Sequence, residues 1–366
     1  MNTMNVSDSF KDPELCKKLL EQLHEELDSP LRFMEVCGTH TVAIFQSGLR
    51  PLLPKEIVHL SGPGCPVCVT HESEVAAFLD LAGKDNVILA TFGDLMRVPG
   101  PKGRNLKLAK AEGARIEIVY SPLDALKLAQ ENPNDTVVFL GVGFETTAPT
   151  IAASIQMAKQ QNLTNFKVLS FHKLVPPALK VLLEDPDCAV DAFLLPGHVS
   201  TILGMEPYHF VAERYNTPGV ITGFDPVDIL ESLLIMVEQR KNGKASIVNQ
   251  YKRAVSDSGN AKAREIMFSV FNIAEAQWRG VGTIPESGLV IKDEYEEFDA
   301  LKALDITLTD VPQTPGCKCG EVLKGKMQPS DCPLFAKGCT PAKPVGPCMV
   351  STEGSCAAYF KYQVTA

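Results

Sequence analysis

The sequence predicts an α/β protein with two lobes built on parallel sheets and a third, mainly helical and irregular domain. Three observations predict this fold. Short apolar runs alternate with helical stretches along the middle of the chain, helical patterns dominate residues 226–276, and six cysteines fall in the last 50 residues. Of the 366 residues, 45% are hydrophobic and 22% charged, so the chain can fill two or three globular domains.

The first predicted element is an amphipathic helix over residues 13–28, where leucines recur at helical spacing. From about residue 55, short β-rich runs end in glycine or proline turns and are followed by helical stretches. Apolar runs separated by helices are typical of parallel sheets. The seven predicted strands cover residues 56–60, 86–91, 115–120, 136–141, 166–171, 192–195 and 219–222.

Seven strands are more than one compact sheet holds comfortably, so we expect two α/β lobes. We place their boundary near residue 135, where Asn132-Pro-Asn-Asp interrupts the pattern. This gives a helix and a cysteine loop over residues 1–50, lobes over 51–135 and 136–225, and a helical, cysteine-rich domain over 226–366.

The cysteine-rich tail predicts an iron–sulfur cluster. Thiols stay reduced in a chain without an export signal, so such a group more often binds metal than forms disulfides. Counted from Cys319, the gaps to Cys332, Cys339 and Cys356 are 12, 6 and 16 residues, whereas zinc sites usually present two C-x-x-C pairs. A four-thiolate 4Fe-4S cluster is therefore favoured over structural zinc, which remains an alternative.

Two loops carry further thiol chemistry. Cys37 and His40 are three residues apart around a glycine, so both can reach one metal ion or form a thiolate–imidazolium pair. The same residues also fit a buried thiol beside a capping threonine. Cys65 and Cys68 form a C-x-x-C pair within disulfide reach, which favours a redox dithiol over half of a metal site.

Three more candidates lie on loops that follow predicted strands. Glu145 follows Gly141-Val-Gly143, which is part of a dinucleotide fingerprint. The third glycine is absent and residues 161–168 hold no carboxylate, so a nucleotide-dependent dehydrogenase is the least favoured interpretation. Glu145 also fits a plain helix-dipole partner. Asp94 and His198 occupy similar turns, where functional residues of open α/β sheets gather.

Charge and hydropathy exclude two classes of partner. The net charge is −9, the basic residues form no dense run, and a nucleic-acid partner is not expected. No stretch approaches the ~20 apolar residues of a membrane span. The N-terminal residues lack the apolar core of a signal peptide, so we expect a soluble, cytoplasmic protein.

Taken together, the motifs resemble those of the HypD family of nickel–iron hydrogenase maturation proteins. The resemblance runs from about residue 31 to the C-terminus. One departure is Val42, where the family often has a second histidine. The matching motifs are Cys37-Gly-Thr-His40-Thr, Gly62-Pro-Gly-Cys65-Pro-Val-Cys68, Gly143-Phe-Glu145-Thr-Thr, Pro196-Gly-His198-Val-Ser, Trp278-Arg-Gly and the tail Cys319-Gly-Glu…Cys332-Pro-Leu-Phe…Cys339…Cys356-Ala-Ala.

The resemblance implies a scaffold that builds the Fe(CN)2CO unit of the hydrogenase, rather than a conventional turnover enzyme. It implies that residues 1–50 pack with the C-terminal domain. It also implies that a small HypC-like chaperone shares the iron, that a HypE-like donor supplies cyanide, and that the hydrogenase large subunit receives the product. A Cys37 thiolate is a soft ligand that suits such iron.

The remaining roles follow from the same resemblance. The tail cluster and the Cys65–Cys68 dithiol make an electron relay. His40 orients or protonates within the site, with Glu145 or Asp94 in support. The family motif aligns on Cys319 as first cluster ligand, with Cys317 as its alternative and Cys348 left free.

Two other functions use the same residues. An iron–sulfur disulfide reductase, similar to ferredoxin–thioredoxin reductase, would need the cluster and the C-x-x-C pair but not Cys37. A structural zinc protein would serve only as a binding platform.

Overall fold

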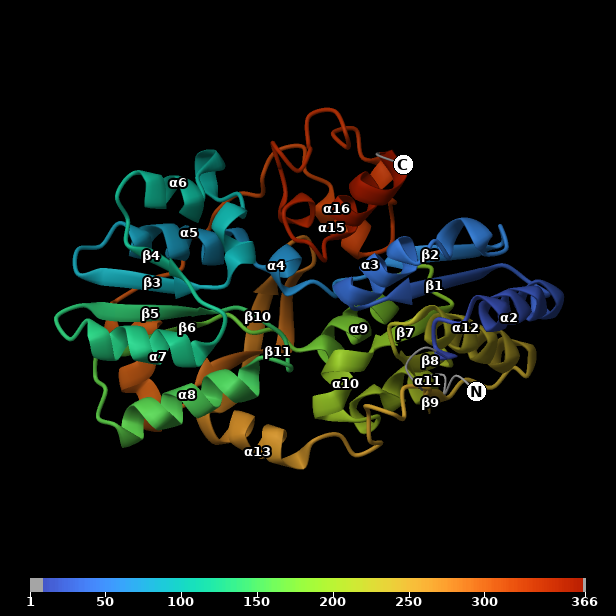
Figure 1. Ribbon diagram of the computed structural model, residues 1–366, viewed down its shortest axis with the longest axis horizontal. Coiled ribbons are helices and arrows are strands. Elements are labelled where there is room, and N and C mark those ends of the chain that lie inside the picture. Colours follow the sequence, from blue (N-terminus) through green and yellow to red (C-terminus); the bar gives the residue numbers. More distant parts are fainter. Residues whose placement is uncertain (1–8, 365–366) are drawn as a thin grey trace, which may run out of the picture.

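A computed structural model describes residues 9–364 and contains two parallel sheets, which confirms the predicted α/β class (Figure 1). Each of the seven predicted strands is present, with ends shifted by a few residues at most. The five-stranded sheet has the order β2 (Ile57–Ser61), β1 (Leu31–Glu35), β7 (Ala192–Pro196), β8 (Gly219–Thr222), β9 (Ile247–Asn249). The four-stranded sheet has the order β4 (Ile116–Ile118), β3 (Val87–Thr91), β5 (Thr136–Gly141), β6 (Phe166–Ser170).

The two sheets do not follow the expected division at residue 135. β5 begins just after that position but pairs with β3 on one side and β6 on the other, so both expected lobes share the four-stranded sheet. β1, which the sequence pattern did not predict, pairs with β2 and β7. The chain thus forms β1 and β2 of the five-stranded sheet, then the whole four-stranded sheet, and then β7, β8 and β9 of the five-stranded sheet. Local hydrophobic pattern does not encode which distant strands pair, so this order escaped prediction.

Helices cover both faces of each sheet, and strands such as β3 and β7 are buried along their whole length. The predicted N-terminal helix is confirmed as α2 (Pro13–Glu26), whose first turn is capped by Asp12. It packs against α12 (Pro226–Lys241). The other helices are α3 (Gly38–Gln46), α4 (Pro66–Val69), α5 (Glu72–Ala82), α6 (Leu106–Ala111), α7 (Pro122–Glu131), α8 (Ala148–Gln160), α9 (Val175–Glu184), α10 (Gly197–Leu203), α11 (His209–Tyr215) and α13 (Ala261–Val270).

An antiparallel hairpin lies between the two lobes in Figure 1. Its strands are β10 (Phe271–Trp278) and β11 (Gly282–Ile291), so the expected helical region ends at Val270 rather than at residue 276. Cross-strand pairing with β11 outweighs the local helical pattern here, because a paired strand satisfies its backbone groups through a distant partner. Trp278 bridges to Thr70, directly after α4.

The cysteine-rich tail forms short helical pieces above α3 and α4 (Figure 1). Arg50 connects the tail to α3. Its guanidinium lies 5.0 Å from the ring centre of Phe45, on α3, and 4.5 Å from that of Tyr359, in the tail. Within residues 9–364, no helix combines the length and hydropathy needed to cross a membrane. The tail pieces are α15 (Cys319–Leu323), η6 (Pro329–Asp331), η7 (Pro347–Met349), α16 (Ser355–Tyr359) and η8 (Phe360–Val364). The short helix α14 (Ala300–Ala303) precedes them and packs against β6.

Candidate functional site

The carboxyl ends of four neighbouring strands bring the predicted motifs together. Cys37 follows β1, the C-x-x-C loop follows β2, His198 follows β7 and Phe224 follows β8. Because these strands are adjacent in one parallel sheet, the loops meet at a single edge, where ligands of open α/β sheets bind.

Close backbone contact holds the Cys37 loop against the C-x-x-C loop. The N–H of Gly38 donates to the oxygen of Gly64 at 3.0 Å, and the N–H of Gly62 donates to the oxygen of Glu35 at 2.7 Å. A Cβ atom on Gly64 would collide with the backbone nitrogen of Cys37. Glycine is therefore required here for the two thiol-bearing loops to lie side by side.

Cys37 is a buried thiol at the N-terminus of α3, with 8% of its surface exposed. Burial, together with the negative charge of Glu353, raises the pKa of Cys37 to about 12. The thiol stays protonated in this surrounding unless a cation compensates the thiolate charge. The Cys37 thiol is therefore neutral and protonated in this structure.

Two carboxyl groups beside Cys37 were missed by the sequence analysis. Glu35 is buried, accepts the N–H of Cys37 at 2.9 Å and the hydroxyl of Thr41 at 2.5 Å, and has its pKa raised to about 8 by burial. Glu353 reaches the site from the tail and accepts the hydroxyl of Thr39 at 2.7 Å. The sequence did carry one sign of this role, because Glu35 is an acidic residue inside the apolar run that precedes Cys37.

His40 is fully buried on the first turns of α3. Its Nε2 lies 2.9 Å from the carbonyl oxygen of Gly223 and 3.1 Å from that of Thr222, so Nε2 must carry the hydrogen. Nδ1 then presents a buried lone pair with no protein partner. Burial lowers the pKa of His40 to about 4, so the ring is neutral and Nδ1 can accept a hydrogen bond or a proton, or bind a metal.

His198 joins this group through an aromatic contact. The ring of Phe224 stacks against His40 at 4.6 Å and against His198 at 4.1 Å between centroids. His198 is exposed, so it marks the open side of the site. Asp94 lies elsewhere, exposed on η2 (Gly93–Arg97) after β3 of the other sheet, and is not among the side chains that contact Cys37 or His40.

The C-x-x-C pair forms a disulfide between Cys65 and Cys68, as its spacing allows. Both sulfurs are buried, with 3% and 0% of the residues exposed. Cys65 is the N-cap of the short helix α4 and Cys68 lies within it. This helix packs against η7 and therefore beside Cys348 of the tail. The disulfide thus lies between the Cys37 loop and the tail thiols.

The predicted cluster ligands gather in one small apolar pocket of the tail. It is lined by Cys317, Cys319, Cys332, Cys339 and Cys356, together with apolar side chains such as Phe335 and Met349. The N–H of Val345 points at the sulfur of Cys339, 3.3 Å away. Soft sulfur donors with a backbone N–H aimed at them suit an iron–sulfur cluster. Among residues 9–364, no three His, Cys, Asp or Glu side chains surround a position for a single metal ion.

Cys319 is the central thiol of this pocket. Hydrogen bonds from Cys317, Cys348 and Cys356 lower its pKa well below the ordinary value. The same contacts and burial raise the pKa of those three neighbours. Cys319 is therefore the thiol of this group that loses its proton most readily.

Glu145 lies in the other sheet, directly after β5. Its Oε1 accepts the N–H of Val175 at 2.9 Å, whereas its buried Oε2 has no partner. Burial raises the pKa of Glu145 to about 7. It lines a cavity between α9, α13 and the hairpin that also contains Arg264 and Glu206, and the structure gives it no contact with Cys37.

Glu145→Gln is expected to change how stability depends on pH. Because the folded-state pKa of about 7 lies above the ordinary 4.5, the stabilisation from Glu145 is complete below pH 4.5 and is lost as pH rises through 7. The glutamine variant lacks this loss, so from pH 4.5 to 7 it should gain about 3 kcal/mol relative to the parent. Urea unfolding at both pH values measures the difference, and parallel pH profiles would refute it.

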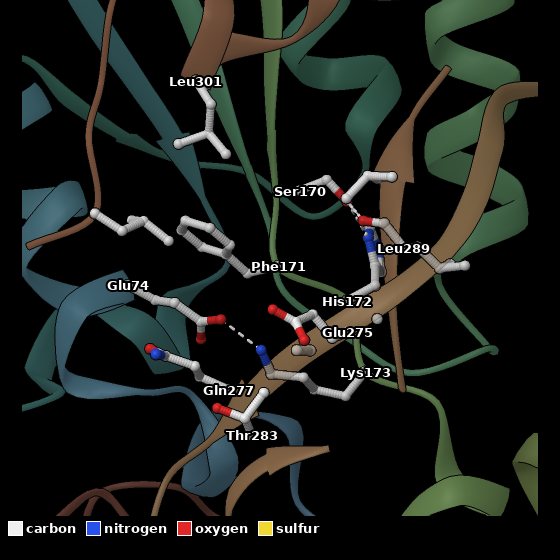
Figure 2. Close-up of a pocket in the computed structure, with 14 residues that line it drawn as sticks. Glu74, Ser170, Phe171, His172, Lys173, Glu275, Gln277, Thr283, Leu289 and Leu301 are labelled. Carbon is white, nitrogen blue, oxygen red and sulfur yellow. Dashed lines mark hydrogen bonds and ion pairs between the residues drawn. The ribbon is translucent and has the colours of Figure 1, made fainter. Parts of the chain in front are cut away.

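A separate pocket beside the hairpin contains a buried ion pair that the sequence analysis also missed (Figure 2). The ammonium of Lys173 pairs with the carboxylate of Glu74, and both side chains are at least 95% buried. Figure 2 shows the pair facing Glu275 and Gln277 of the hairpin. Glu74 also accepts the N–H of His71 at 2.9 Å, at the start of α5. The pair thus fixes the segment that follows the disulfide helix against the end of β6.

Comparison with known proteins gives matches along nearly the whole chain. The HypD family model, described as the hydrogenase formation hypA family, matches residues 14–363. The hydrogenase maturation factor HypD2 of Bradyrhizobium diazoefficiens is 44% identical, over 98% of this chain and 97% of its own length. HypD of Escherichia coli is also 44% identical, over 98% of both chains. The hydrogenase expression/formation protein HupD of Azotobacter chroococcum is 41% identical, over 98% of this chain and 97% of its own.

Proposed function

Because the chain belongs to the HypD family of hydrogenase maturation proteins, we propose that it is the scaffold on which the Fe(CN)2CO unit of nickel–iron hydrogenase is assembled. The iron is the cargo, and the thiolate of Cys37 holds it. The observation that carries this proposal is the Cys37 site itself. A buried thiol with a pKa of about 12 lies one helical turn from a buried, unpaired imidazole nitrogen.

The side chains around Cys37 prepare it for a metal cargo. Iron that carries cyanide and carbon monoxide is low-valent and favours soft donors, which a thiolate provides. The Cys37 proton must leave as iron binds, and the positive charge of the iron favours this loss. The Nδ1 atom of His40, on the first turn of α3, is a neutral and unpaired donor. Glu35 fixes the loop through the Cys37 N–H and the Thr41 hydroxyl. Glu353 adds a negative charge that favours a cationic cargo.

The tail thiols fit a resident 4Fe-4S cluster, since five of them line one pocket. We assign Cys319, Cys332, Cys339 and Cys356 as its ligands, with Cys317 as the alternative to Cys319. The chemistry such a cluster supplies is one-electron transfer. Lys318 and Val345 stand beside this pocket, and the backbone of Val345 stabilises the sulfur of Cys339.

The Cys65–Cys68 pair supplies two electrons in this proposal. Releasing cyanide from a thiocyanate carrier breaks a sulfur–carbon bond and requires two electrons, which leave a thiolate and a cyanide ion. A dithiol at Cys65 and Cys68 yields two electrons and two protons as it becomes the disulfide seen in the structure. Its place beside the Cys37 loop brings these electrons close to the cargo.

Replacing Cys65 or Cys68 by serine is expected to spare the fold and block assembly. Serine conserves the volume of the buried pair but cannot form a disulfide, so the electron pair is lost. Hydrogenase activity in cells whose own scaffold gene is deleted should fall to background with either variant, while circular dichroism and the brown colour persist. Normal hydrogenase activity with both variants would disprove the relay.

Three partners follow from this function. A small HypC-like chaperone docks on the scaffold and shares the iron, a HypE-like donor brings the cyanide, and the hydrogenase large subunit receives the finished unit. The exposed His198 marks the open side of the site, from which these partners approach. Assembly takes place in the cytoplasm.

Infrared spectroscopy tests the proposal directly. The protein is purified without oxygen from cells that also express the small chaperone. Metal-bound cyanide and carbon monoxide absorb where protein is nearly silent, so bands in this window are the expected result. An empty window, from a preparation with both partners present and the iron–sulfur colour intact, would contradict the scaffold function.

The iron–sulfur disulfide reductase remains a second candidate because α4 packs beside the tail thiols. The two functions differ in their use of Cys37, which the reductase does not need. Catalytic reduction of a small disulfide that survives Cys37→Ala would favour the reductase over the scaffold.

A further inference from the structure

Cys317 is a thiol that the proposed four-ligand cluster does not use, and it lies against a cluster ligand. Its Sγ is 3.2 Å from the Sγ of Cys319, with only Lys318 between the two residues. Gly346 packs over both sulfurs, and a Cβ atom at that position would collide with each of them. The backbone therefore presses the two sulfurs together on one side of the tail pocket.

The two sulfurs differ in access and in how they are held. Cys319 is 7% exposed and begins α15, whereas Cys317 is half-buried on the irregular segment that precedes this helix. Gly316, with a φ of +78°, turns the chain just before Cys317. An oxidant from solvent therefore meets Cys317 first, and the segment that carries it can adjust. A disulfide needs an S–S distance of about 2.05 Å, so the sulfurs must approach by roughly 1 Å.

We propose that Cys317 and Cys319 form a disulfide in the cluster-free protein, and that this bond withholds the first cluster ligand until it is reduced. The inference rests on the proposed 4Fe-4S site. Cys319 is the ligand that the disulfide withholds, so Cys317→Ser leaves the ligand set complete. Its effect is to couple cluster loading to a reducing environment and to protect the paired sulfurs from irreversible oxidation.

The oxidant is a low-molecular-weight disulfide such as oxidised glutathione. Cys317 passes its proton to the sulfur of Cys319, to which it donates a hydrogen bond. It then attacks one sulfur of the glutathione disulfide, breaks the S–S bond and releases one glutathione thiolate. Cys319 then attacks the mixed disulfide at the sulfur of Cys317 and releases the second. Two protein thiols are oxidised by two electrons, the glutathione disulfide is reduced by the same two, and the two protons pass to the released thiols.

Two other thiols compete for Cys319 within the pocket. Cys348 and Cys356 also contact it, but they are 0% and 8% exposed and are carried by η7 and α16. Neither can meet a solvent oxidant as readily as Cys317. This difference gives the inference a matched control, because Cys348→Ser removes a neighbour of Cys319 that this disulfide does not use.

The test uses the full-length, cluster-free protein, prepared by chelation and reduction and then exposed to oxidised glutathione. Free thiols are alkylated and peptides are analysed by mass spectrometry. The expected product links Cys317 to Cys319 and loses two hydrogens. The mixed disulfide at Cys317 should not accumulate, because the second step is intramolecular, whereas a glutathione adduct at the isolated Cys188 should persist. A lasting glutathione adduct on Cys317, or a link from Cys319 to Cys332, Cys339, Cys348 or Cys356, would overturn the inference.

Cluster reconstitution gives a second readout. Oxidised parent protein and oxidised Cys348→Ser should take up little iron and sulfide until dithiothreitol is added, whereas oxidised Cys317→Ser should take them up at once. Equal uptake by all three would overturn the withholding role. If the linked peptide forms but the reduced parent binds no cluster, the proposed cluster is wrong and the disulfide stands.

Discussion

Cys37→Ala is expected to abolish the infrared bands of metal-bound cyanide and carbon monoxide while leaving the tail cluster intact. Alanine removes the only sulfur at the carboxyl end of β1, and neither Glu35 nor His40 offers a soft donor in its place. Hydrogenase maturation should fall more than about 100-fold, since loss of a neighbour of a metal ligand already costs 10–100-fold. The brown colour should persist, because the cluster thiols belong to the tail.

A matched control separates this effect from a general loss of thiols. Cys188 is another thiol whose pKa is raised by burial, and it lies outside the site, on the loop before β7. Cys188→Ala should therefore retain the infrared bands and maturation. Bands that survive in Cys37→Ala would show that Cys37 does not hold the iron. Bands lost from both variants would show that the loss is not specific to Cys37, which also contradicts the assignment.

Cys332→Ala is expected to bleach the protein and loosen the tail. The tail has little apolar core of its own, so a bound cluster contributes directly to its folding. Iron and sulfide content should fall to near zero, and proteases should cut residues 305–364 faster than in the parent. Lobe unfolding, followed by circular dichroism, should change little because both sheets lie outside the tail.

The control for the second prediction is Cys16→Ala, half-buried on α2 and far along the chain from the tail, which should keep its iron and colour. Metal analysis also tests the competing structural interpretation. A colourless parent that binds zinc in proportion to protein, and loses it in Cys332→Ala, would identify a zinc platform and exclude the 4Fe-4S proposal.

The sequence was sufficient to predict features that depend only on spacing or composition within a short segment. The C-x-x-C spacing predicted that Cys65 and Cys68 lie within disulfide reach. The 4Fe-4S cluster expected from the tail cysteines stays a prediction, although the four expected ligands do line one pocket. Apolar runs of five or six residues also located the strands, because a strand buried on both faces is apolar along nearly its whole length.

Features that depend on distant partners were not predictable in this way. β1 is short and carries the polar Glu35, so its place between β2 and β7 is visible only in the fold. Glu353 was hidden because the residues around it were interpreted as part of the cluster motif, whereas its side chain reaches Thr39. The pairing of Glu74 with Lys173 likewise joins two segments that share no local pattern.

The strand order also has a consequence for synthesis on the ribosome. The four-stranded sheet comes from one continuous stretch, so it can form as soon as that stretch emerges. β1 and β2 emerge earlier but must wait for β7, and pairing of strands far apart in sequence is slow. The carbonyl groups that bind His40 come later still, and Glu353 comes almost last. A nascent chain therefore cannot offer a finished Cys37 site before nearly all of its residues have emerged.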